Sequence, residues 1–139
     1  MLVKGFDNRE YKLKLLTKQR TNCSKGHIRA RKLLKKIFPN DIIYEEVTLL
    51  GSKKINKNIL YCDFLIPSHD ILVEVHGKQH YEMGYFHDSK LSFIKSKSND
   101  LRKIEWCELN NISYIELPDG ESDAEWELRI FNRYESEEV

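Results

Sequence analysis

Cysteine and long apolar runs are scarce in this chain of 139 residues, and their scarcity excludes several classes of protein. The three cysteines, Cys23, Cys62 and Cys107, form an odd and widely spaced set, which argues against a disulfide framework and against a CxxC zinc site. No apolar stretch reaches the roughly 18 residues that a membrane-spanning helix needs, and the first residues lack the apolar segment of a signal peptide. We therefore expect an intracellular, cytoplasmic protein that does not enter a membrane.

Acidic residues are missing from residues 11–40, which contain ten lysines and arginines, whereas residues 116–139 contain nine acids and two arginines. The net charge of +1 hides this asymmetry. A basic segment attracts phosphates, and neutralising them releases counterions, so nucleic acid is a candidate partner. The alternative is that the two ends only solvate the molecule or partly neutralise each other.

The hydrophobic pattern predicts one domain of α/β or α+β class, with a mixed central sheet flanked by helices. Strands are expected at residues 42–50, 59–66, 71–76 and 112–117, the first three as a meander, and helices at residues 89–110 and 123–134. Another helix should begin after Ser24 as N-cap and end before Pro39. The predicted parts are a basic helical arm (residues 1–22), a core (23–120) and an acidic C-terminal helix and tail (121–139).

The predicted helix after Ser24 has one apolar side and one basic side. At about 100° per residue, His27 falls on the side of Leu34 and Phe38, so its ring is expected to point inward. The opposite side is basic, and with one lysine from a later loop it supplies the residues expected to contact nucleic acid: Lys25, Arg29, Lys32, Lys36 and Lys78.

Two acids stand in the middle of strands that are otherwise apolar. In residues 71–76, Glu74 and His76 share one face with Leu72, whereas the other face is aliphatic. Asp63 lies within residues 59–66, and a turn at residues 67–70 would place it on a strand paired with that of Glu74. Two carboxylates this close repel each other, so one takes up a proton or a cation lies between them. Oxygen ligands of this kind favour Mg²⁺, which activates water and stabilises a phosphoryl transition state.

Three further side chains could belong to the same site. His76 could act as a general base or contact phosphate, and His80 follows shortly after it. Asp100 aligns with the apolar side of the helix at residues 89–110 and could orient a histidine. The alternatives are that the strand residues are edge polar groups facing solvent, and that Asp100 makes an ordinary helix contact with Lys103.

These residues resemble the PD-(D/E)XK nucleases, most closely the branch of very-short-patch repair endonucleases. The similar segments are residues 63–67 (DFLIP), 72–77 (LVEVHG), 79–81 (QHY), 100–103 (DLRK), 111–115 (NISYI) and the helix start at residues 24–28 (SKGHI). The resemblance implies DNA phosphodiester hydrolysis with Mg²⁺, for which Mn²⁺ could substitute. By matching position, Asp63 and Glu74 would be metal ligands, and His76 would stand where the superfamily usually has its lysine. His80 would be a second active-site histidine, and Asp100 would pair with it.

His27 departs from this pattern, because it stands where the branch often has a glutamate. It could contact a water on the metal or a phosphate, or it could mark a weakened nuclease. The resemblance suggests an endonuclease that nicks DNA or cuts both strands, of a phage or mobile-element homing type, with a repair or restriction role as the alternative. The small size suggests a homodimer or a separate specificity partner. The competing predictions are a nuclease fold that binds DNA without cutting it and, more weakly, a zinc protein.

Overall fold

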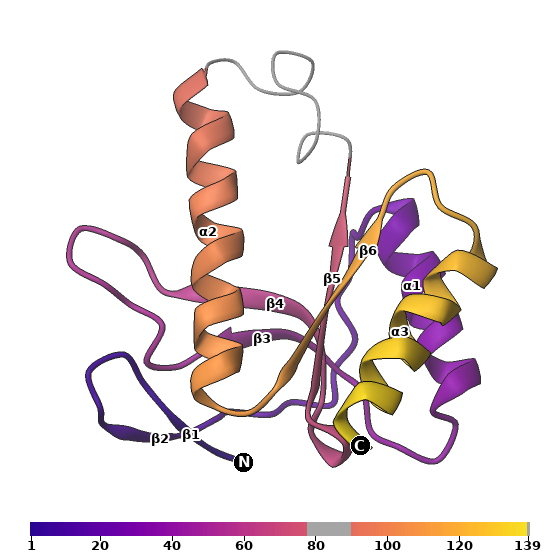
Figure 1. Ribbon diagram of the computed structural model, residues 1–139, viewed down its shortest axis with the longest axis horizontal. Helices are drawn as coiled ribbons and strands as arrows, with labels where there is room; N and C mark the ends of the chain where they lie inside the picture. Colours follow the sequence, from indigo (N-terminus) through magenta and orange to yellow (C-terminus); the bar gives the residue numbers. More distant parts are fainter. Residues whose placement is uncertain (78–89, 139) are drawn as a thin grey trace.

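A four-stranded mixed sheet forms the centre of the computed structural model, which describes residues 1–77 and 90–138 (Figure 1). The strands are β3 (Tyr44–Leu49), β4 (Leu60–Ile66), β5 (Ile71–His76) and β6 (Ser113–Pro118), in the order β3-β4-β5-β6. Neighbouring strands from β3 to β5 are antiparallel, and β6 is parallel to β5. The mixed sheet, the meander and the flanking helices that the sequence predicts are confirmed.

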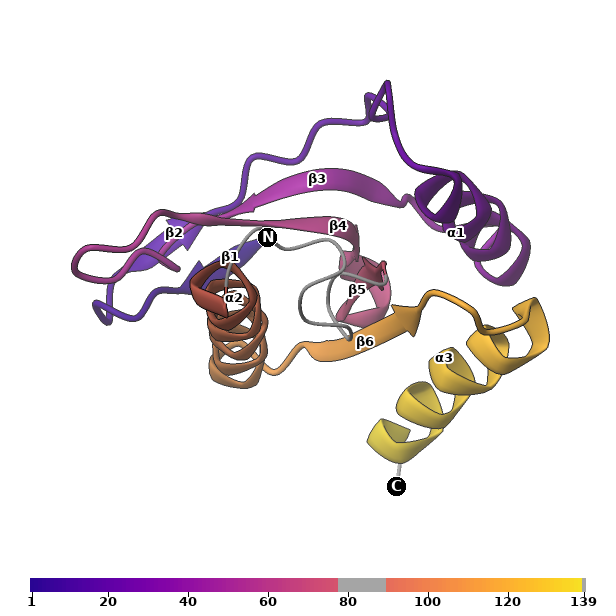
Figure 2. The same cartoon turned by 90° about the horizontal axis from the view of Figure 1, so that it is seen from above.

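Helices cover both faces of this sheet, and each face has its own core (Figure 2). α1 (Lys25–Ile37) and α3 (Asp123–Glu138) lie on one side, where Leu34 and Trp126 pack against Phe64 and Val73. α2 (Lys90–Leu109) lies on the other, where Trp106 joins a core built from the opposite strand faces. Because both faces are buried, any charged side chain in the middle of a strand must be neutralised within the protein.

The start of α1 follows the capping rule by which it was predicted. Ser24 is the N-cap, and its side-chain oxygen accepts a hydrogen bond of 3.1 Å from the backbone N–H of His27. The helix ends at Ile37, two residues before Pro39. His27 is 2% exposed, which confirms that it points inward. The cap therefore fixes the turn of helix that brings this ring to the sheet.

The prediction that the basic arm of residues 1–22 is helical, over about residues 7–20, is wrong. Residues there form the second strand of a hairpin, β1 (Leu2–Lys4) with β2 (Glu10–Lys12), and then an extended run without regular structure. The turn is made by Asn8, which adopts a φ of 65°, and by the backbone N–H of Gly5 bonding the carbonyl of Arg9. Val3 and Leu13 are buried in the α2-side core. The many charged residues of this segment obscure its short apolar alternation in the sequence. Its apolar side chains nevertheless pack against the core.

A local break in the sheet lies beside Asp63. Glu46 has a φ of 51°, in the left-handed region, and the β3–β4 pairing passes from Glu45 to Val47 without it. Across this break the strand changes face. Glu45 reaches α1, whereas Val47 lies in the α2-side core. Strained backbone of this kind gathers at functional sites, and here it lets Glu45 of β3 reach His27 of α1.

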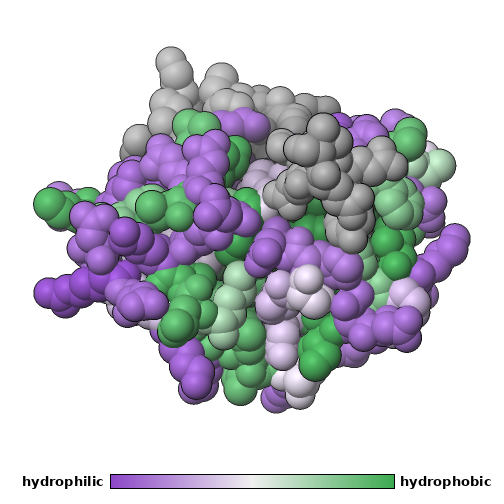
Figure 3. Space-filling view, turned by 60° about the horizontal axis from the view of Figure 1, so that its bottom comes forward, coloured by the Kyte–Doolittle hydropathy of each residue, from purple (hydrophilic) through white to green (hydrophobic). Residues whose placement is uncertain are grey.

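Hydrophobic surface interrupts the hydrophilic surface on the underside of the molecule (Figure 3). Leu2, Ile42 and Leu109 are among the large apolar side chains exposed to solvent.

No helix in residues 1–77 and 90–138 is long and apolar enough to cross a membrane.

Candidate functional site

Where β4 and β5 separate, the side-chain carboxylates of Asp63 and Glu74 take the place of the backbone hydrogen bonds between the two strands. The ladder ends at the pair Phe64 and Val73. One residue further, the backbone N–H of Asp63 donates to Glu74 Oε2 at 2.8 Å, and the N–H of Val75 donates to Asp63 Oδ2 at 2.8 Å. Each acid is thereby fixed by the opposite strand. The sequence-based prediction that these two acids lie on paired strands is confirmed.

Glu74 is the more deeply buried of the two acids, with 3% of its side chain exposed against 24% for Asp63. Burial and the neighbouring Asp63 carboxylate raise the pKa of Glu74 to about 8. Its partner is Lys103 of α2, whose ammonium contacts Glu74 Oε1. Burial would lower the pKa of Lys103, but the charges of Glu74, Asp63 and Asp100 outweigh it and raise that pKa. The ammonium therefore remains charged beside the acid.

Protein stability should therefore fall as pH rises toward 8 in a chelating buffer. Between the ordinary pKa of 4.5 and the folded pKa of about 8, the folded state holds a proton on Glu74 that the unfolded state releases, so unfolding becomes easier as pH increases. The slope can reach at most about 1.4 kcal/mol per pH unit. Thermal melts of wild type and Glu74→Gln at pH 6, 7 and 8 test this. Parallel curves for the two proteins would rule out Glu74 as the origin of the slope.

Asp63 Oδ1 is the carboxylate oxygen of this pair that accepts no hydrogen bond from the described part of the chain. Two positively charged or ionisable groups lie near it. Arg20 Nη1 is 3.7 Å away and His27 Nδ1 is 4.0 Å away, both beyond ordinary hydrogen-bonding distance. The Asp63 side chain is 24% exposed and that of Arg20 is 38% exposed, so solvent reaches this side of the acid.

A second buried acid, Glu45 of β3, stands behind His27. Glu45 Oε1 lies 2.7 Å from His27 Nε2, and Arg31 donates to both carboxylate oxygens at 2.7 Å. Burial would raise the pKa of Glu45, but the hydrogen bonds from Arg31 and His27 outweigh it, so the pKa is lowered. The His27 ring stacks on Phe64 with centroids 4.3 Å apart. The imidazole is therefore fixed in place.

His76 occupies the end of β5 in a separate polar group. Its Nδ1 lies 3.0 Å from Glu116 Oε1, and its Nε2 lies 3.2 Å from the Tyr114 hydroxyl and 3.7 Å from Asp100 Oδ1. His76 is 4% exposed. The structure thus brings Asp100 to His76, whereas the resemblance paired Asp100 with His80. His80 and Lys78 lie outside the described residues.

The polar groups that were not predicted carry sequence signals that differ in strength. Glu45 carries a weak signal, because the left-handed break at Glu46 places it on the opposite face of β3 from the buried Val47 and Leu49. Lys103 was considered only as a helix partner of Asp100, and its contact with Glu74 depends on how α2 packs. Arg20 carries no signal, because it lies in a segment without regular structure.

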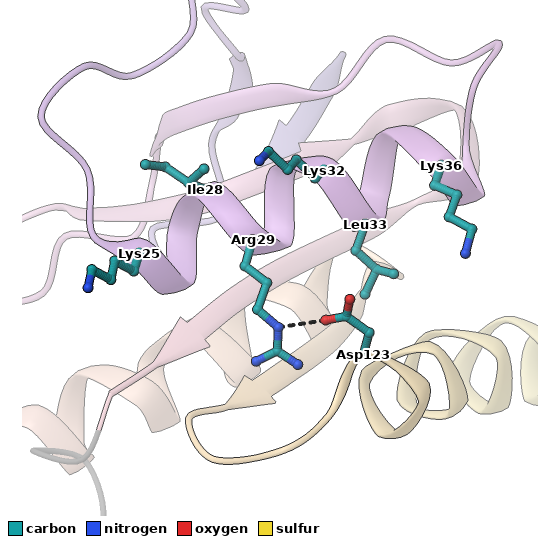
Figure 4. A pocket seen from close by; sticks show the side chains of 7 residues that line it. All are labelled: Lys25, Ile28, Arg29, Lys32, Leu33, Lys36 and Asp123. Atoms are coloured by element: carbon teal, nitrogen blue, oxygen red, sulfur yellow. Dashed lines mark hydrogen bonds and ion pairs between the residues drawn. The ribbon is translucent and has the colours of Figure 1, made fainter.

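On the basic side of α1, the Arg29 side chain points toward Asp123 at the start of α3 (Figure 4). Arg29 donates to Asp123 Oδ1 and to the Glu121 carbonyl, each at 2.6 Å, and its guanidinium stacks on Trp126. Lys36 lies 3.6 Å from Glu127. Part of the basic segment is therefore neutralised by the acidic C-terminal helix, whereas Lys25 and Lys32 are exposed.

The donor set at Asp63 and Glu74 fits a hard divalent cation. Two carboxylates beside each other raise a pKa by repulsion, and a cation between them would relieve it. Within residues 1–77 and 90–138, no three His, Cys, Asp or Glu side chains form a ready-made metal site. An ion held by these two acids would therefore need further oxygen ligands from outside the described residues.

Comparison of the chain with protein-family models, with curated proteins and with solved structures finds no match. A functional proposal therefore rests on the residues and their geometry.

Proposed function

We propose that this protein is a divalent-metal-dependent DNA endonuclease of PD-(D/E)XK type, with Asp63 and Glu74 as the ligands of Mg²⁺ or Mn²⁺. The observation that supports this best is the pair of acids at the point where β4 and β5 part, each hydrogen-bonded to the other strand at 2.8 Å. A fixed pair of carboxylates that opens to solvent on the Asp63 side suits an ion that must also reach a phosphate.

The surrounding side chains have separate tasks in this proposal. A bound ion would polarise the scissile phosphate and acidify a water molecule. Lys103 holds Glu74 Oε1 and supplies positive charge beside the phosphoryl group. His76, held between Glu116, Tyr114 and Asp100, would exchange a proton at Nε2. Arg20 lies at the open side, where it would meet the DNA backbone.

A DNA-binding module that does not cut is the second candidate, and one observation favours it. The Lys103 ammonium already contacts Glu74, and Arg31 pairs with the Glu45 carboxylate. Ion pairs could therefore stabilise this group of acids without any metal. The two candidates differ in whether Asp63, which has no hydrogen-bonded cation among the described residues, binds an ion.

Incubation of the purified chain with supercoiled plasmid separates the two candidates. The nuclease proposal predicts open-circular or linear DNA with Mg²⁺ or Mn²⁺ and none with EDTA. Retarded plasmid or duplex that stays intact with either metal, over a panel of sequences, would contradict the nuclease and support the binding module.

Removal of the exposed lysines of α1 should weaken DNA binding in a salt-dependent manner. Each phosphate contact contributes about 0.9 to the slope of log K against log salt, so Lys25→Ala with Lys32→Ala should reduce that slope by about 2 if each lysine contacts one phosphate. Fluorescence anisotropy in EDTA measures binding without cleavage. Lys53→Ala, at another exposed lysine, is the control, and an unchanged slope in the double variant would exclude this side of α1 from the interface.

A further inference from the structure

The Nδ1 atom of His27 is a buried polar atom without a hydrogen-bond partner among the described residues. The residue is 2% exposed, so water does not readily compensate for the missing bond. The nearest acid is Asp63, whose Oδ1 lies 4.0 Å from this nitrogen. A buried nitrogen and a carboxylate oxygen thus face each other without bonding.

The other side of the ring determines what Nδ1 can do. Glu45 is held as a carboxylate by two hydrogen bonds of 2.7 Å from Arg31, so at 2.7 Å the His27 Nε2 must donate its proton to it. A neutral imidazole with its proton on Nε2 presents a lone pair at Nδ1. Two acceptors, Nδ1 and Asp63 Oδ1, then face each other, and a cation between them would satisfy both.

We propose that His27 Nδ1 and Asp63 Oδ1 bind the same divalent ion and that this mixed pair of ligands makes the site prefer Mn²⁺ to Mg²⁺. The inference rests on the metal site of the proposed function and adds a ligand to it. Imidazole nitrogen suits first-row transition metals, whereas Mg²⁺ favours oxygen ligands and retained water. The separation of 4.0 Å is less than the sum of two bonds of about 2.1 Å, so one ion can contact both atoms.

Three contacts prepare His27 for this role. Glu45 orients the ring through the nitrogen opposite Nδ1, as the outer carboxylate does in carboxylate–histidine–metal arrangements. Phe64 stacks on the ring, and Ser24 caps the helix at the His27 N–H. Arg20, 3.7 Å from Asp63 Oδ1 and 38% exposed, is the cation that an incoming metal would displace.

Electron paramagnetic resonance of Mn²⁺ bound to the full-length chain tests the proposal without relying on activity. Mn²⁺ binding is measured directly and Mg²⁺ binding by competition, in wild type, His27→Gln and Asp63→Asn. Gln can donate to Glu45 in place of Nε2 but has no nitrogen at the position of Nδ1. We expect wild type to bind Mn²⁺ at least about tenfold more tightly than Mg²⁺, and His27→Gln to lose about 10–100-fold in Mn²⁺ affinity with a much smaller change for Mg²⁺.

Pulsed electron paramagnetic resonance on the same wild-type sample shows whether nitrogen is bound to Mn²⁺. We expect a directly bound nitrogen whose signal changes with ¹⁵N-labelled histidine, a result that does not require the variant to fold. Mn²⁺ bound only through oxygen, or an unchanged Mn²⁺ affinity in a folded His27→Gln, would overturn the role of His27 and leave the nuclease proposal intact. Unchanged metal affinity in Asp63→Asn would instead overturn the metal site itself, and the nuclease proposal with it.

Discussion

Asp63→Asn is expected to abolish metal-dependent cleavage of DNA, with a loss on the order of 10³-fold or more in initial rate. Asn keeps an oxygen that can accept the hydrogen bond from the Val75 N–H, so the local backbone should persist. The amide carries no charge with which to hold a divalent ion. Removing that charge also removes the repulsion that contributes to the high pKa of Glu74, so the variant should be at least as stable as wild type at pH 8.

In this variant a loss of activity can therefore be distinguished from a loss of folding. Initial rates of plasmid nicking and thermal melts on the same preparations give both quantities. Glu108→Gln is the matched control, because it removes one negative charge from an exposed position on α2 and should cleave like wild type. Cleavage by Asp63→Asn within a few-fold of wild type would show that Asp63 is not at the active centre.

Lys103→Met is expected to destabilise the fold by about 3 kcal/mol at pH 8.5, because it leaves the buried Glu74 carboxylate without its cation. At lower pH the cost should shrink, since Glu74, whose pKa is already raised to about 8, can take up a proton instead. Denaturant unfolding at pH 6 and pH 8.5 measures both values. The variant should also cleave DNA more slowly, because Glu74 would lose the contact that orients it.

A double-mutant cycle shows whether the effect belongs to this pair. Glu74→Gln combined with Lys103→Met removes both charges and should recover most of the stability lost in Lys103→Met. Lys54→Met provides the comparison, because it removes a lysine from an exposed pair with Glu105 and should change stability little. Equal losses for Lys103→Met with and without Glu74 would mean that the lysine stabilises the protein through other contacts.

The sheet and α1 could be predicted because their local signals agree with their burial. Ser24 caps, Pro39 follows the helix end, and an Asp and a Glu in apolar strands indicate a polar site between them. The N-terminal hairpin could not be predicted in the same way. Its two strands are three residues long. Val3 and Leu13 are its buried core residues, and Met1, Phe6 and Tyr11 are partly buried beside them, so its abundant charge dominates the sequence pattern.

The sequence predicted the strand residues of the candidate site. It predicted only some of the groups that reach the site from other elements. Asp63 and Glu74 meet because a single turn joins their strands. Glu45 turns toward His27 only because Glu46 adopts a left-handed φ of 51°, and Lys103 reaches Glu74 only through the packing of α2. Contacts that depend on a local backbone break or on helix placement have no counterpart in residue spacing.

The claim that Asp63 and Glu74 hold a divalent ion is tested most directly by titrating Mn²⁺ into the ¹⁵N-labelled protein and recording its amide spectrum. The paramagnetic ion broadens the signals of amides close to it. The account predicts that broadening begins at residues 62–64 and 73–75, is reversed by EDTA and is lost in Asp63→Asn. Broadening that begins instead at the acidic residues of α3, or that leaves both strands unaffected, would contradict it.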